Sequence, residues 1–362
     1  MCGITGYYSH KNTFSQEDLE KMTSSLTHRG PDAFGYFTDE VVGLGHRRLS
    51  ILDLSANGNQ PMHSHNSRYV VSFNGEIYNY QEIANELKLI YPSANINFNS
   101  SSDTEVILEA FSYWGIDFVE KLNGMFAIAI YDKQEQELYI VRDRLGIKPI
   151  YYYWNGHDFA FASELKGLSK LKNIPKQINH DAVYYFLNVG FIPAPMSIWS
   201  SIKKLQPGTI LQISKNRINH HRYWTPKEKI KEDVIDSEKK ALVRMSDLLS
   251  SSIQYQMKSD VPFGVFLSGG TDSSLLTAQA VNLSTVKLNT FSIGFKESKY
   301  NEAIYARTIA NYLRTNHYEF IVAYKDAIEL IDKMMTVYDE PYADSSAIPT
   351  MLVSKLASKY VT

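Results

Sequence analysis

The sequence of 362 residues contains a single cysteine, Cys2. One cysteine excludes an internal disulfide bond, and a chain without disulfides is typical of the reducing cytoplasm. Because Cys2 directly follows Met1, the chain has no room for the charged start of a signal peptide. We therefore expect a cytoplasmic protein, and any thiol chemistry must take place at position 2.

Charge excess, long apolar runs and histidine clusters are also lacking. The 37 Lys and Arg residues nearly balance the 39 Asp and Glu residues, which disfavours nucleic acid as a partner. No apolar run approaches the roughly 18 residues that a membrane span needs. The adjacent His220 and His221 lack metal-ligand spacing, which disfavours a metal enzyme. We expect small-molecule partners and no membrane, and we leave a homodimer open.

The length and composition are sufficient for two domains with ordinary hydrophobic cores. Prolines are frequent between Phe191 and Leu211, and Lys and Glu are dense between Thr225 and Lys240, as at a domain boundary. We predict a first domain over residues 2–210, a linker over 211–235 and a second domain over 236–362.

The first residues combine a nucleophile with a base. If Met1 is removed, as the small side chain of Cys2 should permit, the chain begins with a thiol and a free α-amine on one residue. An α-amine with a pKa of roughly 7.7–8.0 accepts a proton near neutral pH far better than a lysine at about 10.4. N-terminal threonine nucleophiles are activated by their own amine in the same way. An incidental cysteine in a frayed terminus is the alternative.

Arg47 and Arg48 interrupt the strand-like stretch Val41–Leu54. A buried arginine needs a partner, because an uncompensated buried charge is very costly. A substrate carboxylate would serve, and a surface salt bridge is the alternative. Further along, Asn74-Gly75 follows the strand-like Tyr69–Phe73, and we interpret it as a turn that directs two N–H donors at one oxygen, as in an oxyanion hole.

Ser102 to Glu105 has the pattern of a capping box at the start of a helix. Asp103 in its first turn is explained by the helix dipole, or it faces a substrate ammonium group. The next segments predict an antiparallel meander. Its strands are Met125–Tyr131, Glu137–Val141, Ile150–Trp154 and Asp158–Ala162.

Five motifs in the same order resemble the glutaminase domain of class II glutamine amidotransferases. They are Cys2-Gly3-Ile4, His28-Arg29-Gly30-Pro31-Asp32, Arg48-Leu49-Ser50-Ile51, Asn74-Gly75-Glu76 and Ser102-Asp103-Thr104-Glu105. The resemblance implies an α+β N-terminal-nucleophile hydrolase with an αββα sandwich over residues 2–210.

By that resemblance, Cys2 attacks the glutamine side-chain amide, its amine transfers the proton, and Asn74 with the Gly75 N–H stabilises the oxyanion. Arg48 would bind the α-carboxylate of glutamine, and Glu76 and Asp103 its α-ammonium group. The implied glutamine-binding residues are Arg48, Leu49, Ser50, Ile51, Leu52, Asn74, Gly75, Glu76 and Asp103.

The stretch from Val261 to Ser274 is the second chemical signal. A buried strand is predicted to end at Leu267, and a Ser-Gly-Gly loop follows, with a helix from about Ser274. Backbone N–H groups at a helix N-terminus bind phosphate where glycine permits close approach. The loop lacks the Gly-Lys-Ser/Thr ending of a kinase-type phosphate loop. Strands alternating with helices after it predict a parallel sheet.

Ser268-Gly269-Gly270-x-Asp272-Ser273-Ser274 resembles the pyrophosphate loop of ATP pyrophosphatases, which cleave ATP to AMP and pyrophosphate. The resemblance implies that Asp272 helps to hold Mg²⁺ and that residues 236–362 are the N-terminal part of an α/β domain of this type. The implied ATP-binding residues are Phe266, Ser268, Gly269, Gly270, Asp272, Ser273, Ser274, Ile293 and Gly294.

Both halves in this order resemble the glutamine-hydrolysing asparagine synthetases. The implied reaction converts aspartate and ATP to β-aspartyl-AMP and pyrophosphate, and ammonia from glutamine then displaces AMP. The alternatives are an amidotransferase for another carboxylate, such as a sugar acid or a peptide precursor, and a non-catalytic scaffold fragment.

That family continues with a second Ser-Gly-x-Gly-x-Asp-Glu signature, whereas this chain stops at Thr362. We therefore expect a C-terminally truncated chain that hydrolyses glutamine weakly and makes no asparagine. The acidic segment Asp339-Glu340-Pro341 is interpreted either as a solvated loop or, by the resemblance, as a segment beside the synthetase site.

Overall fold

The computed structural model describes residues 1–92, 96–229, 234–296 and 301–362. The chain divides into two compact units: Met1–Lys231 with Asp339–Tyr342, and Glu232–Tyr338 with Ala343–Thr362. Residues 230–233 of the predicted linker lie outside the described part. Within that part, no helix has both the length and the apolar character needed to cross a membrane.

The first unit is built mainly of strands. They are β1 (Gly3–Tyr8), β2 (Ala33–Thr38), β3 (Val42–Arg48), β4 (Met62–His63), β5 (Tyr69–Ile77), β6 (Gly124–Asp132), β7 (Glu137–Arg142), β8 (Tyr151–Trp154), β9 (Phe159–Ala162), β10 (Ile202–Lys204), β11 (Thr209–Ser214) and β12 (Arg217–Arg222). The α-helices are α1 (Gln16–Ser24), α2 (Tyr80–Ile90), α3 (Asp103–Trp114), α4 (Phe118–Lys121), α5 (Leu165–Leu168), α6 (His180–Val189) and α7 (Pro226–Lys229). Two short 3₁₀-helices are η1 (Ala56–Gly58) and η3 (Gly115–Asp117).

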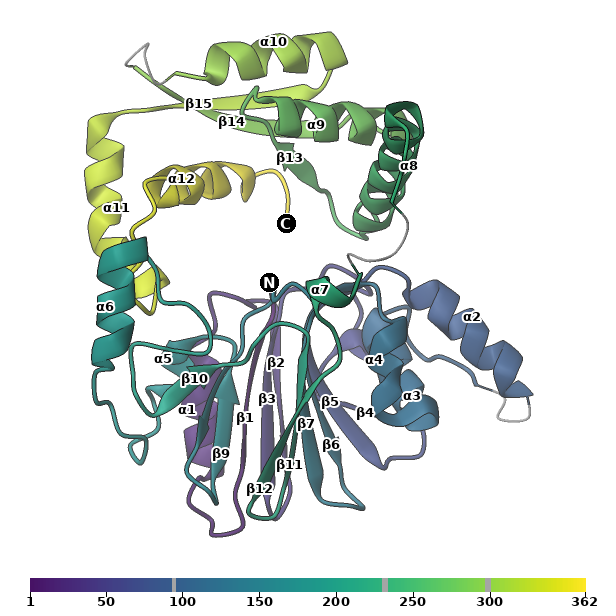
Figure 1. The fold of residues 1–362 in the computed structure, drawn as a ribbon, viewed down its shortest axis with the longest axis vertical. Coiled ribbons are helices and arrows are strands. Elements are labelled where there is room, and N and C mark those ends of the chain that lie inside the picture. The colour runs from purple at the N-terminus through teal and green to yellow at the C-terminus, as the bar shows by residue number, and fades with distance from the viewer. Residues whose placement is uncertain (93–95, 230–233, 297–300) are drawn as a thin grey trace. The chain divides into compact units, whose positions relative to one another are not determined.

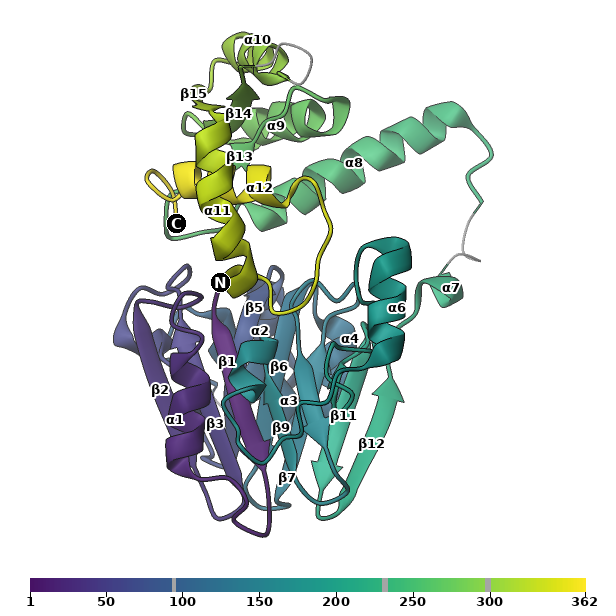
Figure 2. The ribbon, with the colours of Figure 1, turned by 90° about the vertical axis from the view of Figure 1, so that its left-hand side faces the viewer.

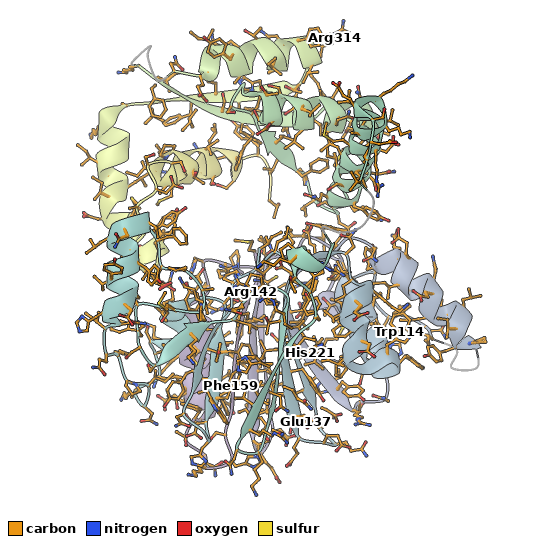
Figure 3. All side chains as sticks on the ribbon, in the orientation of Figure 1. Trp114, Glu137, Arg142, Phe159, His221 and Arg314 are labelled. Carbon is orange, nitrogen blue, oxygen red and sulfur yellow. The ribbon has the colours of Figure 1, made fainter. Side chains whose placement is uncertain are left out.

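These strands form two six-stranded antiparallel sheets, in the orders β10-β8-β9-β1-β3-β2 and β12-β11-β7-β6-β5-β4. Alternate side chains of each sheet meet in one buried cluster, to which Ile4 and Phe161 contribute from the first sheet and Ala129 and Ile140 from the second. The sheets therefore pack face to face. Figure 3 shows the side chains that fill this space, Phe159 among them.

Helices cover the two outer faces (Figure 1). Leu19 of α1 and Leu165 of α5 are buried in a cluster with residues of the first sheet. Ile83 of α2 and Phe111 of α3 are buried in a cluster with residues of the second sheet. The four layers form an αββα sandwich, the arrangement expected for residues 2–210.

The predicted meander is wrong in one respect. Strands β6 and β7 belong to the second sheet, whereas β8 and β9 belong to the first. The loop between β7 and β8 is organised by Asp143, which is 1% exposed and whose carboxylate accepts hydrogen bonds from the backbone N–H groups of Phe126, Leu145, Ile147 and Lys148. This folded loop carries the chain from one sheet to the other.

The predicted turn at Asn74-Gly75 is also wrong. Strand β5 continues through both residues to Ile77, and Asn74 pairs with Ala127 of β6. Gly75 is required by crowding, because a Cβ atom there would lie 2.2 Å from the carbonyl oxygen of Met125. The Asn-Gly pair therefore marks a close approach of two strands.

The second unit contains a parallel sheet in the order β13-β14-β15, as predicted. Its strands are β13 (Gly264–Phe266), β14 (Asn289–Phe295) and β15 (Asn316–Val322). Its helices are α8 (Glu238–Gln256), α9 (Thr271–Leu283), α10 (Ala303–Leu313), α11 (Tyr324–Val337) and α12 (Ala347–Ala357). Figure 2 shows α8 as one long helix.

Two details of this unit differ from the prediction. The strand before the glycine loop is only partly buried, and Phe266 at its end is 51% exposed. Helix α9 begins at Thr271 instead of near Ser274, because Gly270 serves as its N-cap residue. The helix N-terminus therefore follows the two glycines directly.

Candidate active site

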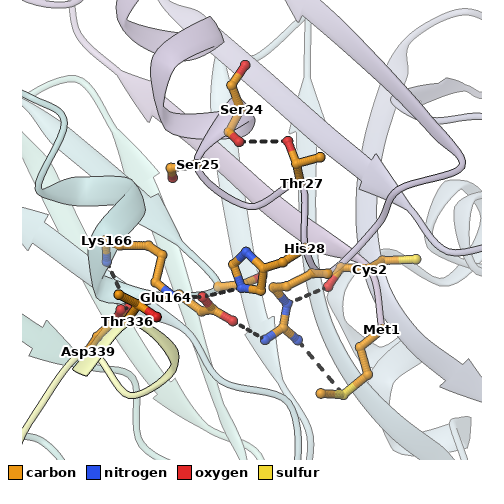
Figure 4. Close-up of polar contacts among 12 residues, drawn as sticks. Met1, Cys2, Ser24, Ser25, Thr27, His28, Glu164, Lys166, Thr336 and Asp339 are labelled. Atoms are coloured by element: carbon orange, nitrogen blue, oxygen red, sulfur yellow. Dashed lines mark hydrogen bonds and ion pairs between the residues drawn. The ribbon is translucent and has the colours of Figure 1, made fainter. Parts of the chain in front are cut away.

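Cys2 directly precedes β1, a central strand of the first sheet. Gly3 pairs with Arg47 of β3, which brings the cysteine next to Leu49. The Cys2 Sγ atom lies 3.4 Å from the Leu49 N–H nitrogen and 3.6 Å from its carbonyl oxygen. Arg29 Nε donates a 2.8 Å hydrogen bond to the Cys2 carbonyl oxygen (Figure 4). Both the side chain and the backbone of Cys2 are therefore held.

The thiol and the terminal amine have complementary acidities. Burial raises the pKa of the Cys2 thiol, against the opposing effects of the Leu49 backbone and the terminal amine. Burial also lowers the pKa of the Met1 amine to about 6. This amine stands in for the one that Cys2 carries once Met1 is removed. At pH 7 an amine with this pKa is largely neutral, so it has the protonation state of a general base, while the raised pKa keeps the thiol protonated.

Asn74 supplies a buried donor that no group of the described residues satisfies. The residue is 1% exposed, and its Nδ2 atom has no hydrogen-bond partner among the described residues. A buried donor left without a partner costs about 1–3 kcal/mol. This unused N–H group beside the first sheet suits an oxygen atom brought by a substrate.

Two carboxyl groups, one from β5 and one from α3, lie close enough to interact electrostatically. Asp103 is 4% exposed and accepts a 2.9 Å hydrogen bond from the Ile77 N–H group. Burial, assisted by the Glu76 carboxylate, raises the pKa of Asp103 to about 7. Burial also raises the pKa of Glu76, although the Lys148 ammonium opposes it. A cationic group placed between the two acids would stabilise both.

The helix that carries Asp103 is not capped by the predicted box. The Ser102 side chain makes no cap hydrogen bond and instead lies 2.9 Å from the Ser100 hydroxyl. Glu105 accepts hydrogen bonds from the N–H groups of Asn99 and Ser100 at 2.9 and 2.7 Å. The acid therefore fastens the preceding loop and not the N-cap backbone.

Arg48 is buried, as predicted, but its contacts are mostly carbonyl oxygens. Its NH1 atom donates to the Ser55 carbonyl at 2.7 Å and to Asn59 Oδ1 at 2.8 Å, and its NH2 atom donates to the Leu52 and Asp53 carbonyls. The guanidinium group thus holds the loop that follows Leu49–Leu52. Its contact with a substrate carboxylate stays a prediction.

In the second unit, the glycine loop has a geometry that only glycine permits. Gly269 has a φ of +83°, and a Cβ atom there would lie 2.6 Å from the backbone nitrogen of Ala306. The hydroxyl groups of Ser268 and Ser273 lie 2.9 Å apart across the loop. Gly270 then begins α9, whose first N–H groups can bind an anion.

Around this loop, the structure places the other predicted nucleotide-binding residues as follows. Ser274 has a buried hydroxyl without a partner among the described residues. Asp272 is exposed in the first turn of α9, and Ile293 and Gly294 lie on the neighbouring strand β14. In the described part of the chain, no cluster of three or more His, Cys, Asp or Glu residues is arranged to hold a metal ion.

Two charged groups of the first unit were missed in the sequence. Lys148 is 5% exposed, and burial lowers its pKa although the Glu76 carboxylate opposes this. Glu164 binds Arg29 and Lys166 through ion pairs of 2.7 and 2.9 Å. The signal for Glu164 was a Glu and a Lys placed directly after the apolar strand Phe159–Ala162, where buried charges need partners.

Comparisons with known protein families divide the chain into two parts, as the structure does. A family model described as a glutamine amidotransferase domain matches residues 1–224. A second, described as asparagine synthase, matches residues 244–362. The two matches lie in the order in which the two sites occur along the chain.

Curated relatives match both parts. Putative asparagine synthetase [glutamine-hydrolyzing] 2 of Methanocaldococcus jannaschii is 40% identical, covering 100% of this chain and 73% of its own length. Asparagine synthetase [glutamine-hydrolyzing] 1 of Bacillus subtilis is 37% identical, and the match covers 100% of this chain and 56% of the relative. Asparagine synthetase B [glutamine-hydrolyzing] of Escherichia coli is 32% identical, and the match covers 91% of this chain and 56% of the relative. The chain thus spans little more than half the length of two of these relatives.

Proposed function

The chain belongs to the family of glutamine-hydrolysing asparagine synthetases, and from this premise we propose that it takes part in glutamine-dependent asparagine synthesis. In this proposal the first unit releases ammonia from glutamine at Cys2. The second unit binds the ATP that activates aspartate as β-aspartyl-AMP. The names of the relatives disfavour the sugar acid, the peptide precursor and the non-catalytic scaffold.

In the first half-reaction, the Cys2 amine removes the thiol proton and the sulfur attacks the amide carbon of glutamine. The C=O π electrons move to oxygen, and the Asn74 amide, with the Gly75 N–H group, stabilises the oxyanion. The amine then protonates the departing nitrogen, which leaves as ammonia. Water hydrolyses the thioester to glutamate and regenerates the thiol.

The charged groups of glutamine would be bound around this centre. Glu76 and Asp103 take the α-ammonium group, a role supported by the raised pKa of both acids. Arg48 and the backbone of Leu49–Leu52 take the α-carboxylate. The support is the short distance between the Cys2 sulfur and Leu49 and the loop that Arg48 holds.

In the second half-reaction, the loop Ser268–Ser274 would cradle the pyrophosphate part of ATP. The left-handed Gly269, the start of α9 and the unpartnered Ser274 hydroxyl support this role. Phe266, Ile293 and Gly294 would line the adenine pocket. Asp272 is the acidic residue in the first turn of α9, and it suits a Mg²⁺ ion that arrives with the phosphates. When bound, that ion neutralises phosphate charge.

The activation step is balanced as follows. An aspartate β-carboxylate oxygen attacks the α-phosphorus of ATP, and pyrophosphate leaves. Ammonia then attacks the acyl carbon of β-aspartyl-AMP, and AMP leaves with the electron pair of the C–O bond. A bare carboxylate resists ammonia because oxide is a poor leaving group, and AMP removes that obstacle.

We also place the glutaminase domain at residues 2–210 and the synthetase domain at 236–362, supported by family matches to 1–224 and 244–362. The dependence on a reduced Cys2 thiol supports a cytoplasmic location. Homodimer formation stays a prediction that sedimentation of the purified protein would test.

The observation that carries the proposal is the position of Cys2, at the start of a central strand and held by Arg29. The test compares the wild type with the Cys2→Ala variant in two assays. The first measures glutamate release from glutamine, and the second measures ATP–pyrophosphate exchange in the presence of aspartate. We expect Cys2→Ala to lose glutamate release and keep the exchange. Equal glutamate release by both proteins would contradict the proposal.

A further inference from the structure

Glu164 is the centre of a partly buried ionic cluster in the first unit. Its Oε1 atom lies 2.7 Å from Arg29 NH1, and its Oε2 atom lies 2.9 Å from both His28 Nε2 and Lys166 Nζ. Burial would raise the pKa of this carboxyl, but the hydrogen bonds from His28, Arg29 and Lys166 prevail and lower it to about 2. Glu164 is therefore ionised at any pH at which the protein works.

Arg29 connects this cluster to the nucleophile. Its side chain is 7% exposed, and it donates to Glu164 through NH1 and to the Cys2 carbonyl oxygen through Nε. Because both bonds belong to one rigid planar group, a shift of the Glu164 carboxylate changes the direction of the bond to Cys2. Once Met1 is removed, Cys2 is a terminal residue with no preceding chain to hold it.

Lys166 connects the cluster to a distant part of the sequence. Its Nζ atom lies 3.3 Å from Asp339 Oδ1, and its backbone N–H group donates to Asp339 Oδ2 at 2.9 Å. Figure 4 shows Glu164 between His28 and Lys166, with Asp339 next to Lys166. The Asp339 side chain is 11% exposed, so the contact is largely shielded from water.

Asp339 belongs to the short segment Asp339–Tyr342, which is part of the first unit although both flanking helices belong to the second. Its neighbour Glu340 is fixed independently. Glu340 accepts hydrogen bonds from the Tyr151 hydroxyl at 2.9 Å and the Ile198 N–H at 2.9 Å, and it pairs with Lys204 at 2.7 Å. No contact that we observe joins these three partners to Arg29.

We propose that Glu164 is a positioning residue for Cys2, and that the Lys166–Asp339 contact makes this positioning respond to the chain between α11 and α12. The inference rests on the proposed glutamine hydrolysis and names its regulation. A movement of Asp339 displaces Lys166 from Glu164, Glu164 then shifts Arg29, and the Cys2 carbonyl loses its fixed direction. A displacement of the segment Asp339–Tyr342 thereby alters the rate of ammonia release.

The experiment uses the full chain and the variants Glu164→Gln, Lys166→Met and Asp339→Asn. Glu340→Gln is the matched control, since it changes the neighbouring acid and its own partners and keeps the Lys166–Asp339 contact. Initial rates of glutamate release give kcat and KM, and alkylation of Cys2 by iodoacetamide gives the reactivity of the sole cysteine. Thermal unfolding checks that each variant is folded.

We expect kcat to fall about fivefold or more in the three variants, with KM within about twofold, because misplacing a nucleophile affects the chemical step more than binding. Alkylation rates should change in the same three variants. Glu340→Gln should stay within about twofold of the wild type, and Lys166→Arg should restore most of the loss.

The double variant Lys166→Met/Asp339→Asn should lose no more than the worse single variant, because both changes break one connection. Additive losses, or an equal loss in Glu340→Gln, would overturn the inference. If the wild type itself releases no glutamate, the proposed function fails. The alkylation rates then still decide whether Glu164 and Asp339 set the reactivity of Cys2.

Discussion

Asn74 carries a buried amide nitrogen that has no hydrogen-bond partner among the described residues. Truncation by Asn74→Ala should lower kcat for glutamate release by roughly 10²–10³, as for other oxyanion-hole donors. Stability should change little, because the Nδ2 atom makes no hydrogen bond that the folded protein would lose. Steady-state kinetics and thermal unfolding of the same preparation test both statements.

Asn79 offers the matched control. Its amide donates to the Lys121 carbonyl at 2.9 Å, and its oxygen accepts from the Asn123 N–H at 2.8 Å. Asn79→Ala should therefore lower the unfolding temperature and leave kcat within about twofold. The reverse pattern, with Asn74→Ala unstable and active, would exclude Asn74 from transition-state stabilisation.

Asp103 gives glutamine binding a pH dependence. Because burial raises its pKa to about 7, the carboxylate is largely ionised above pH 7 and increasingly protonated below it. Only the ionised form attracts an α-ammonium group, so KM for glutamine should rise as the pH falls from 8 to 6. Asp103→Asn should raise KM roughly tenfold at pH 8, the loss expected for one charge-assisted hydrogen bond, and flatten the profile. An unchanged KM at pH 8 would contradict this role.

The sequence identified individual residues where the chemistry is local. The pairing of a thiol with its own amine at Cys2 needs no tertiary information. The carbonyl partners of Arg48 could not be predicted, because they depend on how residues 52–59 fold back over the guanidinium group. Glu164 was missed for a similar reason, because its partner Arg29 lies 135 residues away in the sequence. Its other partner, Lys166, is only two residues away.

Elements were predictable where periodicity is strong and less so where strands cross between layers. Strand β14 (Asn289–Phe295) belongs to the parallel sheet that the alternation of strands and helices predicted. The hairpins β6–β7 and β8–β9 were predicted as strands, but their division between two sheets depends on the buried Asp143. Asn74-Gly75 was mistaken for a turn because composition does not reveal that β6 pairs with the whole of β5.

The glycine loop before α9 is an element whose shape can be tested. A methyl group at Gly269 meets the backbone nitrogen of Ala306 at 2.6 Å in a left-handed conformation, whereas at Gly270 its nearest neighbour is the Ser268 hydroxyl at 3.3 Å. Gly269→Ala should destabilise the second unit by about 1–3 kcal/mol through overpacking, and Gly270→Ala clearly less. Denaturant unfolding of both variants checks the order, and equal losses would contradict the loop geometry.

For the whole molecule, the sequence predicted two parts and the chemistry of each. It did not predict that Asp339–Tyr342 belongs to the first unit. The interpretation of this segment as a solvated loop is wrong for Asp339 and Glu340, whose side chains are only 11% and 9% exposed, whereas Pro341 is exposed. Their partners lie in the first unit, and local sequence carries no signal for contacts over such separations.

His46 ties the stability of the first unit to pH. It is fully buried, its Nε2 atom lies 3.0 Å from the Phe73 carbonyl oxygen, and burial lowers its pKa from 6.5 to about 3. The unfolded chain therefore binds a proton below about pH 6.5 that the folded chain refuses. This contribution to stability is complete above pH 6.5 and is lost as the pH falls towards 3.

We expect the free energy of unfolding to fall between pH 6.5 and 5, with up to about 1.4 kcal/mol per pH unit from this one proton. His46→Gln, which cannot take up a proton, should reduce that slope whatever its own stability. Urea unfolding at several pH values provides the measurement. An identical slope in the variant would show that His46 is not the group responsible.

The central claim is that the α-amine of Cys2 is the base for its own thiol, and the direct measurement compares one preparation before and after removal of Met1 by an aminopeptidase. Intact mass gives the trimmed fraction, and glutamate release gives kcat. The claim predicts that kcat rises in proportion to the fraction of chains that begin at Cys2. Equal rates from chains that keep Met1 would contradict it.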